Sequence, residues 1–316
     1  MSQVIFAKYS SMRRKDFRIS TCIYQSDIKK FVKKIALTSE TQKRFVEITE
    51  LHSRLKDQLK NKNARLCEIV EHDKSKLVFE YIEGNTLEKE LHQFIINKDK
   101  EQFHKSIESF WNFLNTAFDP VSFQSNKLFS EIFPSVKADY FNNLQGFSGV
   151  ANIDMNFDNL IIENGDYHVF DLDWLFDCNI PLAYIFYRSL NSFYIRIPEA
   201  EEIVPEKSFY EQLGISEYLT QFSTMEIDFQ NYANSSSRHL DGYLKESKTV
   251  SSMEHSINIL KQEQQRLDGE VKKWHDETAR LNNENGVLVA EVNRYENSKS
   301  WRYMKFFRYL SRLIKR

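Results

Sequence analysis

The sequence is poor in cysteine and has no long apolar run. Its three cysteines, Cys22, Cys67 and Cys178, are widely spaced and odd in number, which excludes a disulfide framework and a CxxC metal site and favours a reducing cytosol. No stretch approaches the ~18 apolar residues of a transmembrane helix. The first residues also lack the apolar core and cleavage site of a signal peptide. We therefore expect a cytoplasmic chain that does not span a membrane.

Positive charge is scarce in most of the chain and concentrated at its end. The formal net charge is −2, but residues 298–316 contain seven Lys and Arg and no acid, so residues 1–297 carry −9. A domain that binds nucleic acid needs a basic face. The acidic body therefore excludes nucleic acid as a partner, and we expect any contact with a polyanion at the basic end.

The first 84 residues have the pattern of a small α+β domain. Five segments rich in β-branched and aromatic residues are predicted to be strands: 4–9, 17–24, 31–37, 65–71 and 76–82. Between the third and fourth, a helical pattern with a polar cap begins at Ser39. Five strands and one inserted helix are therefore expected in residues 1–84.

Residues 85–240 are predicted to form a second, mainly helical region rich in aromatic residues. Within it, residues 160–163 and 168–170 have the pattern of a short β-hairpin that turns at Asn164, Gly165 and Asp166. The 316 residues, 41% of them hydrophobic, allow one sizeable core and an extension. The two regions together predict a two-lobed α+β fold.

The residues around this hairpin have the composition of a phosphoryl-transfer site. Asp154 and Asn159 are five positions apart, and Asp171 follows the hairpin. Phosphoryl transfer needs a carboxylate that orients the acceptor hydroxyl, and an amide and a carboxylate that hold Mg²⁺ on the phosphates. Taken singly, these residues are more typical of turn caps or of a solvated acidic loop. Their order along the chain favours the phosphoryl-transfer interpretation.

Several strings in this order resemble the protein-kinase-like superfamily, in particular aminoglycoside and choline kinases. The strings are FEYIEGNTLE, NIDMNFDNLII and FDLDWLFDCNIPLAYIFYRSL. They are most similar to kinase-like modules attached to methyltransferases and glycosyltransferases of bacterial surface-polysaccharide assembly, where a kinase and a coiled coil can form an O-polysaccharide chain terminator. The resemblance covers residues 1 to about 232 as an N-lobe (1–84) and a C-lobe (85–240).

The resemblance implies roles for eight residues, with ATP and Mg²⁺ as cofactors. Asp154 is expected to be the catalytic base, and Asn159, Asp171 and Asp173 to serve the metal. Lys33 is expected to hold the phosphates with Glu47 as its acidic partner, and Glu80 and Ile82 to lie at the hinge that binds adenine.

Two of these assignments required a choice between neighbours. Strand alternation groups Lys33 with Phe31 and Ile35, the more apolar face, so Lys33 is preferred to Lys34. Glu47 is preferred to Glu50 because it borders the apolar stripe of its helix. Both choices rest on local periodicity alone.

The sequence departs from the kinase pattern at two places. Asn152 stands where the usual histidine is expected, and the turn at residues 10–16 contains no glycine. Arg13, Arg14 or Lys15 in this turn can supply charge in place of a glycine cradle. No methyltransferase segment precedes the kinase-like region, so we expect that activity to be absent or on another chain.

Residues 247–296 have a heptad pattern. Two sets of positions repeat every seven residues: a, at Val250, Ile257, Gln264, Val271, Thr278, Asn285 and Val292; and d, at Met253, Leu260, Leu267, Trp274, Leu281, Leu288 and Tyr295. The d positions are all apolar or aromatic, which predicts a coiled coil and a homo-oligomer. Asn285 at an a position favours a parallel dimer and leaves a trimer open. A single helix packed on its own domain is the alternative.

Residues 298–316 are predicted to form an amphipathic helix. Tyr303, Phe306, Phe307, Leu310, Leu313 and Ile314 fall on one side of a helical wheel, and Arg302, Lys305, Arg308, Arg312, Lys315 and Arg316 on the other. Apolar and cationic faces of this kind are typical of helices that lie on anionic membranes. Packing of the tail on its own or a partner protein is the alternative.

Three functional hypotheses follow. The first is an ATP-dependent kinase, peripheral on the inner face of the cell membrane, that phosphorylates a hydroxyl of a lipid-linked surface polysaccharide in O-antigen-type chain termination. Its partners would be the glycan, glycosyltransferases or a separate methyltransferase. The second is an inactive pseudokinase scaffold that recruits glycosyltransferases to the membrane. The third is a kinase of a small soluble metabolite, which leaves the coiled coil and tail without a purpose.

Overall fold

The computed structural model describes residues 3–26, 29–234, 250–296, 298 and 304. The chain divides into two compact units at Thr249 and Val250. We call residues 3–234 the body and treat the long helix that follows separately. The predicted domain limits at residues 84 and 240 stay predictions, and residue 240 lies outside the described residues.

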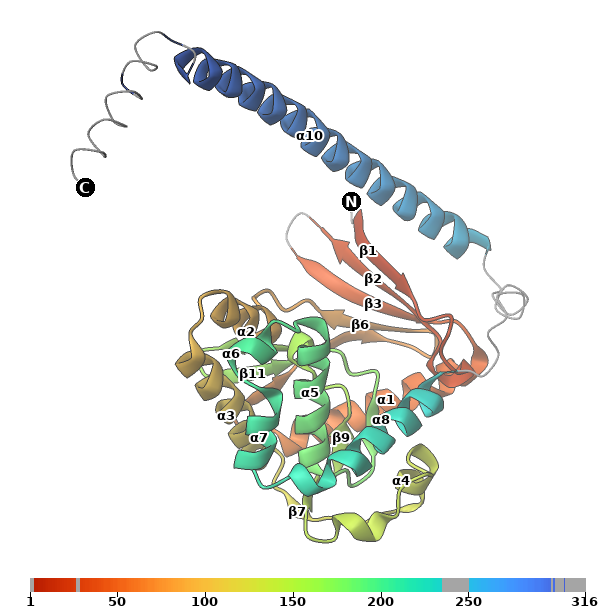
Figure 1. Cartoon of the computed structure of the whole chain (residues 1–316). Coiled ribbons are helices and arrows are strands. Elements are labelled where there is room, and N and C mark those ends of the chain that lie inside the picture. Colours follow the sequence, from red (N-terminus) through yellow and green to blue (C-terminus); the bar gives the residue numbers. More distant parts are fainter. Residues whose placement is uncertain (1–2, 27–28, 235–249, 297, 299–303, 305–316) are drawn as a thin grey trace, which may run out of the picture. The chain divides into compact units, whose positions relative to one another are not determined.

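The N-terminal part of the body is a five-stranded antiparallel sheet in the order β1-β2-β3-β6-β5 (Figure 1). The strands are β1 (Gln3–Tyr9), β2 (Ile19–Gln25), β3 (Lys30–Ala36), β5 (Ile69–His72) and β6 (Lys76–Glu80). Lys15–Phe17 form a short 3₁₀ helix, so the second strand begins two residues later than predicted. The expected five-stranded lobe is confirmed.

The predicted strand at 65–71 is split in two. Its first part, β4 (Ala64–Leu66), pairs in parallel with β11 (Asp166–Val169) and leaves the five-stranded sheet. β11 also pairs with β10 (Leu160–Glu163), which forms the predicted hairpin. Asn164 and Gly165 have φ of 52° and 85°, the left-handed backbone that a tight two-residue hairpin turn requires.

Helix α1 (Ser39–Gln58) packs on the sheet through contacts with β3 and β6. Its N-cap is Thr38, whose side chain accepts a hydrogen bond from the Thr41 backbone N–H, so the cap lies one residue before the predicted Ser39. The buried face contains Phe45, Ile48, Leu51 and Leu55. This apolar stripe joins α1 to the core of the body.

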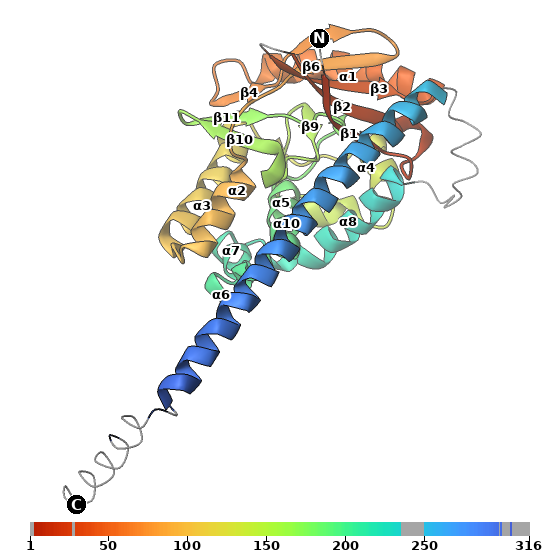
Figure 2. The same cartoon turned by 90° about the horizontal axis from the view of Figure 1, so that it is seen from above.

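The rest of the body is mainly helical (Figures 1 and 2). Its helices are α2 (Leu87–Ile96), α3 (Lys100–Ala117), α4 (Lys127–Ile132), α5 (Leu182–Arg196), α6 (Ala200–Ile203), α7 (Glu206–Gln212) and α8 (Leu219–Ala233). Short strands lie among them: β7 (Val121–Ser122), β8 (Gln145–Gly146), β9 (Val150–Asn152) and β12 (Leu175–Asp177). Buried aromatic rings such as Phe110, Phe157 and Phe193 pack between α3, α5 and the loop before β10. The two-lobed α+β architecture is confirmed.

The second unit contains α10 (Val250–Glu296), one continuous helix of 47 residues (Figures 1 and 2). At the predicted heptad positions, Val271, Trp274, Leu281, Leu288 and Val292 are 50–71% exposed. Pairing with another chain stays a prediction. The predicted tail lies outside the described residues except Ser298 and Met304. Within the parts of the chain that the structure describes, no helix has the length and apolarity needed to cross a membrane.

Candidate active site

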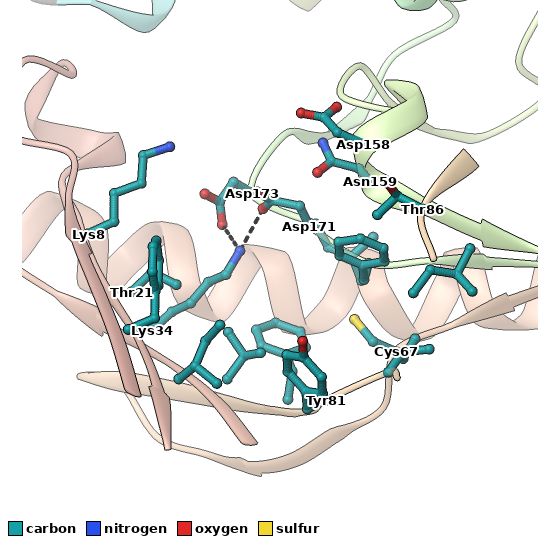
Figure 3. Close-up of a pocket in the computed structure, with 18 of the residues that line it drawn as sticks. Lys8, Thr21, Lys34, Cys67, Tyr81, Thr86, Asp158, Asn159, Asp171 and Asp173 are labelled. Atoms are coloured by element: carbon teal, nitrogen blue, oxygen red, sulfur yellow. Dashed lines mark hydrogen bonds and ion pairs between the residues drawn. The ribbon is translucent and has the colours of Figure 1, made fainter. Parts of the chain in front are cut away.

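A cavity of about 400 Å³ lies between the five-stranded sheet and the loops around the β10–β11 hairpin (Figure 3). Its sheet side is formed by Ile23, Val32 and Phe79, and its opposite side includes Ile161 and Leu172. Cavities of this size with apolar walls and a few polar groups are typical of sites for small ligands. Two apolar walls facing each other suit a flat aromatic ring.

The hinge segment that follows β6 borders this cavity. Glu80 and Ile82, both predicted at the hinge, line the cavity together with Tyr81 and Gly84. Glu80 is fixed in two ways: its backbone N–H donates to the Glu68 carbonyl at 3.0 Å, and its carboxylate accepts from the Glu68 N–H at 3.0 Å. Gly84 has φ of +146°, and a Cβ there would lie 2.9 Å from Ile161 Cγ2. The chain therefore needs glycine where the hinge approaches β10.

The lysine that enters the cavity is Lys34, and the prediction of Lys33 is wrong. Val32 and Lys34 share the face of β3 that lines the cavity, and Lys34 is only 5% exposed. Lys33 lies on the opposite face, where its ammonium is 5.8 Å from the centre of the Tyr24 ring. The side chains of β3 do alternate between two faces, as expected. The larger apolar residues, Phe31 and Ile35, however, lie on the face away from the cavity.

Glu47 is not the partner of this lysine, which corrects the second choice. Its carboxylate pairs with Arg44 at 2.7 Å on the same helix, and its side chain is 50% exposed. The buried face of α1 has Thr41, Arg44 and Phe45 in its first two turns. Arg44 donates to the carbonyl oxygen of Leu175 in β12. Helix α1 is thus bound to the other lobe by a cation and presents no acid to Lys34.

Lys34 instead lies between two aspartates that follow β11. Its Nζ is 2.7 Å from Asp171 Oδ1 and 2.5 Å from Asp173 Oδ1 (Figure 3). Burial disfavours the ammonium, but the two carboxylates outweigh this and raise the pKa of Lys34. Lys34 therefore stays charged at neutral pH.

Asp171 occupies a constrained position at the end of the hairpin. Its φ is +50°, a left-handed conformation that is uncommon outside glycine and concentrates at functional sites. Burial, followed by repulsion from Asp173, raises the pKa of Asp171 above its ordinary value, while Lys34 opposes the shift. One carboxylate oxygen contacts Lys34 and the side chain remains 36% exposed at the cavity. Its other oxygen is left for a ligand.

Asp173 has a different environment from the one expected of a metal ligand. Oδ1 contacts Lys34, and Oδ2 is 2.9 Å from a terminal nitrogen of Arg13. Burial opposes its ionisation, but Lys34 and Arg13 lower the pKa of Asp173 to about 2. Both carboxylate oxygens are engaged by cations, so in this structure Asp173 is an ion-pair partner, and its predicted place at the metal stays a prediction.

Asp154 and Asn159, the two residues of the D-x4-N spacing, are in contact. The Asn159 Nδ2 donates to the Asp154 carbonyl at 2.9 Å and to its Oδ2 at 3.1 Å. Asp154 Oδ1 accepts from Asn156 at 2.9 Å and faces Arg188 of α5 at 3.3 Å. Burial is the main cause that raises the pKa of Asp154, and Arg188 opposes it. Asn159 lines the cavity, and Asp154 lies behind it with its side chain 16% exposed.

The oxygen atoms around the cavity fit a magnesium ion. Among the described residues, no group of three or more His, Cys, Asp or Glu side chains is placed to hold a metal. Mg²⁺ in phosphate sites instead takes one or two protein oxygens together with phosphates and water. The amide N–H of Asn159 is used by Asp154, which leaves its amide oxygen available at the cavity that Asp171 also lines. One amide and one carboxylate are the required donors.

Three residues of the site lacked a firm prediction. Asn152, noted only as a departure, is fully buried; its Oδ1 accepts from the Asp154 N–H at 3.1 Å and its Nδ2 donates to the Asp171 carbonyl at 3.4 Å. Asn152 therefore links the loop that contains Asp154 to the loop that contains Asp171. Arg13 was one of three candidate cations in its turn. Arg188 had no local signal, because it reaches Asp154 across 34 positions of the chain.

Comparison with known proteins finds similar solved structures but no match to a protein family or to a curated protein sequence. Similar solved structures include APH(2″)-IIa in a ternary complex with streptomycin and ATP, at 13% identity and a TM-score of 0.36, covering 72% of this chain and 91% of that one. Ethanolamine kinase of Plasmodium vivax matches at 12% identity and a TM-score of 0.34, covering 73% and 72%. ADP-bound aminoglycoside phosphotransferase APH(2″)-Ib matches at 10% identity and a TM-score of 0.34, covering 78% of this chain and 90% of that one.

Proposed function

We propose that this chain is an ATP- and Mg²⁺-dependent phosphotransferase that acts on a hydroxyl group. One observation carries the proposal: Lys34, Asn159 and Asp171 meet at a single cavity, with Asp154 in contact with Asn159. These residues come from β3, the loop before β10 and the end of β11, segments that only the folded chain brings together. A lysine, an amide and two carboxylates are the groups that phosphoryl transfer from ATP requires.

The residues divide the work by position. The apolar walls and the hinge at residues 80–84 would bind adenine, and Lys34 would contact the phosphates. Asn159 and Asp171 would hold Mg²⁺, which when bound neutralises phosphate charge. Asp154 would accept a hydrogen bond from the acceptor hydroxyl and orient it, and its raised pKa suits a group that takes up a proton.

For the acceptor, we propose a lipid-linked surface polysaccharide at the inner face of the cell membrane. The resemblance of the sequence to polysaccharide-assembly kinases supports this acceptor. The cationic and apolar sides of residues 298–316 support a place on anionic lipid, next to such a glycan. Glycosyltransferases or a separate methyltransferase would then be partners at the same membrane.

We further propose that α10 mediates self-association as a parallel dimer. Its exposed heptad residues, among them Trp274, Leu281 and Leu288, form the seam that a second copy would cover. A dimer would carry two basic tails, and two weak membrane contacts on one particle bind more strongly than one.

An inactive scaffold is the second candidate. Asn152 in place of histidine, the glycine-free turn and an α1 that offers no acid to Lys34 favour it. This candidate keeps the fold and the oligomer and dispenses with phosphoryl transfer.

ATP consumption in the presence of lipid-linked glycan separates these candidates. We expect turnover by the wild-type protein that depends on Mg²⁺ and glycan and is absent in Asp171→Ala. The exposed Lys127→Ala variant, in α4, serves as a matched control and should retain turnover. If both the wild type and Asp171→Ala show only background turnover, the phosphotransferase is rejected and the inactive scaffold remains as the candidate function. Equal turnover with a soluble hydroxyl compound and no glycan would instead favour a small-metabolite kinase.

A further inference from the structure

The lysine of the cavity is held in a way that the kinase-like sequence pattern does not predict. Lys34 is 5% exposed, and a buried ammonium needs an acid in contact with it. In the predicted arrangement α1 supplies that acid. In the structure the predicted candidate on α1, Glu47, is half exposed and paired with Arg44. The partners of Lys34 come from the other lobe.

Asp173 is the more firmly fixed of these two partners. Its side chain is 11% exposed, and each of its carboxylate oxygens contacts a different cation, Lys34 at 2.5 Å and Arg13 at 2.9 Å. Asp171 contacts Lys34 through one oxygen only and is 36% exposed. Asp173 can therefore hold the lysine while Asp171 keeps an oxygen for the metal.

Arg13 is itself fixed by the surrounding structure. Its guanidinium lies 4.8 Å from the centre of the Trp174 ring, and its backbone carbonyl accepts from Arg18 Nε at 2.9 Å. The next residue donates its backbone N–H to Ala233 of α8 at 2.9 Å. The turn at residues 10–18 thus rests on the helical lobe and delivers a cation to Asp173.

We propose that Asp173, clamped by Arg13, is the positioning residue that holds Lys34 at the phosphates, in place of an acid from α1. The proposal rests on the proposed phosphotransferase function. It separates two roles that adjoin in the sequence: Asp173 orients the lysine, and Asp171 serves the metal. Without Asp173, Lys34 would draw on Asp171 alone and compete with Mg²⁺ for that carboxylate.

The ion pair is tested first without reference to activity, by double-mutant cycles on the unfolding equilibrium of the full chain. Lys34→Met and Asp173→Asn should be coupled by roughly tenfold or more in the unfolding constant, because they remove two partners of one buried pair. Lys34→Met and Glu47→Gln should show no coupling. Coupling with Glu47 and none with Asp173 would overturn the proposal.

The positioning role is tested by kinetics with ATP and by adenosine binding. Asp173→Asn should lower kcat/KM for ATP by roughly tenfold or more and raise the Mg²⁺ concentration needed for half-maximal activity, with adenosine affinity unchanged. Arg13→Met should repeat this pattern in weaker form, and Arg13→Lys should recover most of the activity. Adenosine binding controls for a damaged pocket.

The outcomes for this proposal and for the proposed function are distinguishable. An active wild type with unchanged kcat/KM and Mg²⁺ dependence in Asp173→Asn would overturn the positioning role and leave the phosphotransferase standing. A comparable loss of kcat/KM for ATP in Glu47→Gln would show that an acid of α1 positions Lys34. A wild type that neither binds nor consumes ATP would refute the phosphotransferase and the positioning role with it. The cycles would then still show which acid holds Lys34.

Discussion

The body and α10 use their apolar residues in opposite ways. In the body, Phe110, Phe157 and Phe193 are fully buried among one another and their neighbours. In α10, the heptad residues Trp274 and Leu288 are 71% and 58% exposed. Burial of apolar surface is the main driving force of folding. The body therefore buries its apolar residues within one chain, whereas these residues of α10 stay exposed, and we propose that a second copy covers them.

The same contrast holds for charge. The body buries ions in matched groups, such as Lys34 with Asp171 and Asp173. Charged pairs on α10 are exposed, as between Arg280 and Glu284 at 2.7 Å. Exposed pairs contribute little to stability, whereas removing one member of a buried group is costly. Changes in the body should thus affect chemistry and folding, and changes in α10 should affect assembly.

The largest effect is expected at Asp154. Asp154→Asn keeps the size of the side chain and removes the carboxylate that we propose accepts the hydroxyl proton, so kcat should fall by roughly 10²–10⁴-fold. Self-association through α10 should be unchanged, which steady-state kinetics and sedimentation can measure on one sample. A variant that loses activity and oligomeric state together would contradict the separation of the two regions.

A core truncation in the body should have the next largest effect. Phe110→Ala removes a ring whose centre lies 5.0 Å from that of Phe157, and should lower the free energy of unfolding by about 3–5 kcal/mol. Trp274→Ala in α10 removes an even larger ring from an exposed position and should change unfolding of the body by less than about 0.5 kcal/mol. Denaturant titration measures both. Equal losses would mean that the body depends on α10 for its stability.

Two adjacent residues of α10 provide a matched test of the seam. Leu288 at a d position and Val287 outside the seam are 58% and 57% exposed. Leu288→Asp would place a carboxylate in the interface and should weaken self-association by about tenfold or more. Val287→Asp adds the same charge outside it and should have little effect. Sedimentation equilibrium measures the self-association of both variants. Equal association constants for the two would contradict the heptad interpretation.

Local signals predicted most of the fold. The hairpin at residues 160–169 followed from its turn residues, and α1 from its apolar stripe. Long-range pairing was not accessible in the same way. Residues 64–66 belong to another sheet because β11, a hundred positions away, pairs with them. No local pattern records that partner, so the predicted strand was too long.

The candidate site shows the same division. Asp154, Asn159 and Asp171 follow from spacing, because the loop and hairpin that place them are short. Choosing between Lys33 and Lys34 required knowing which face of β3 lines the cavity. The larger apolar residues of this strand, Phe31 and Ile35, share the opposite face with Lys33. The Arg13 clamp depends on packing against Trp174 and α8, which only the folded chain creates.

The smallest expected effect concerns pH and belongs to the body. His52 of α1 is buried with Nε2 2.9 Å from the Cys67 carbonyl oxygen. Burial lowers the pKa of His52 below its ordinary 6.5, although this carbonyl and Glu68 oppose the shift. Because the folded pKa is the lower one, the unfolded chain takes up the proton first as pH falls. The free energy of unfolding should therefore decrease below pH 6.5, by at most about 1.4 kcal/mol per pH unit for one proton.

His52→Gln isolates this contribution, because glutamine can still donate a hydrogen bond to the Cys67 carbonyl but does not titrate. Denaturant titrations of both proteins between pH 5 and 8 should give curves that converge as pH falls, with the steeper slope in the wild type. Parallel curves would show that protonation of His52 does not oppose folding. Residues 271–294 of α10 are exposed, so the same difference should persist when Leu288→Asp is added to both proteins. If it did not, the stability of the body would be linked to assembly, and the two regions would not be independent.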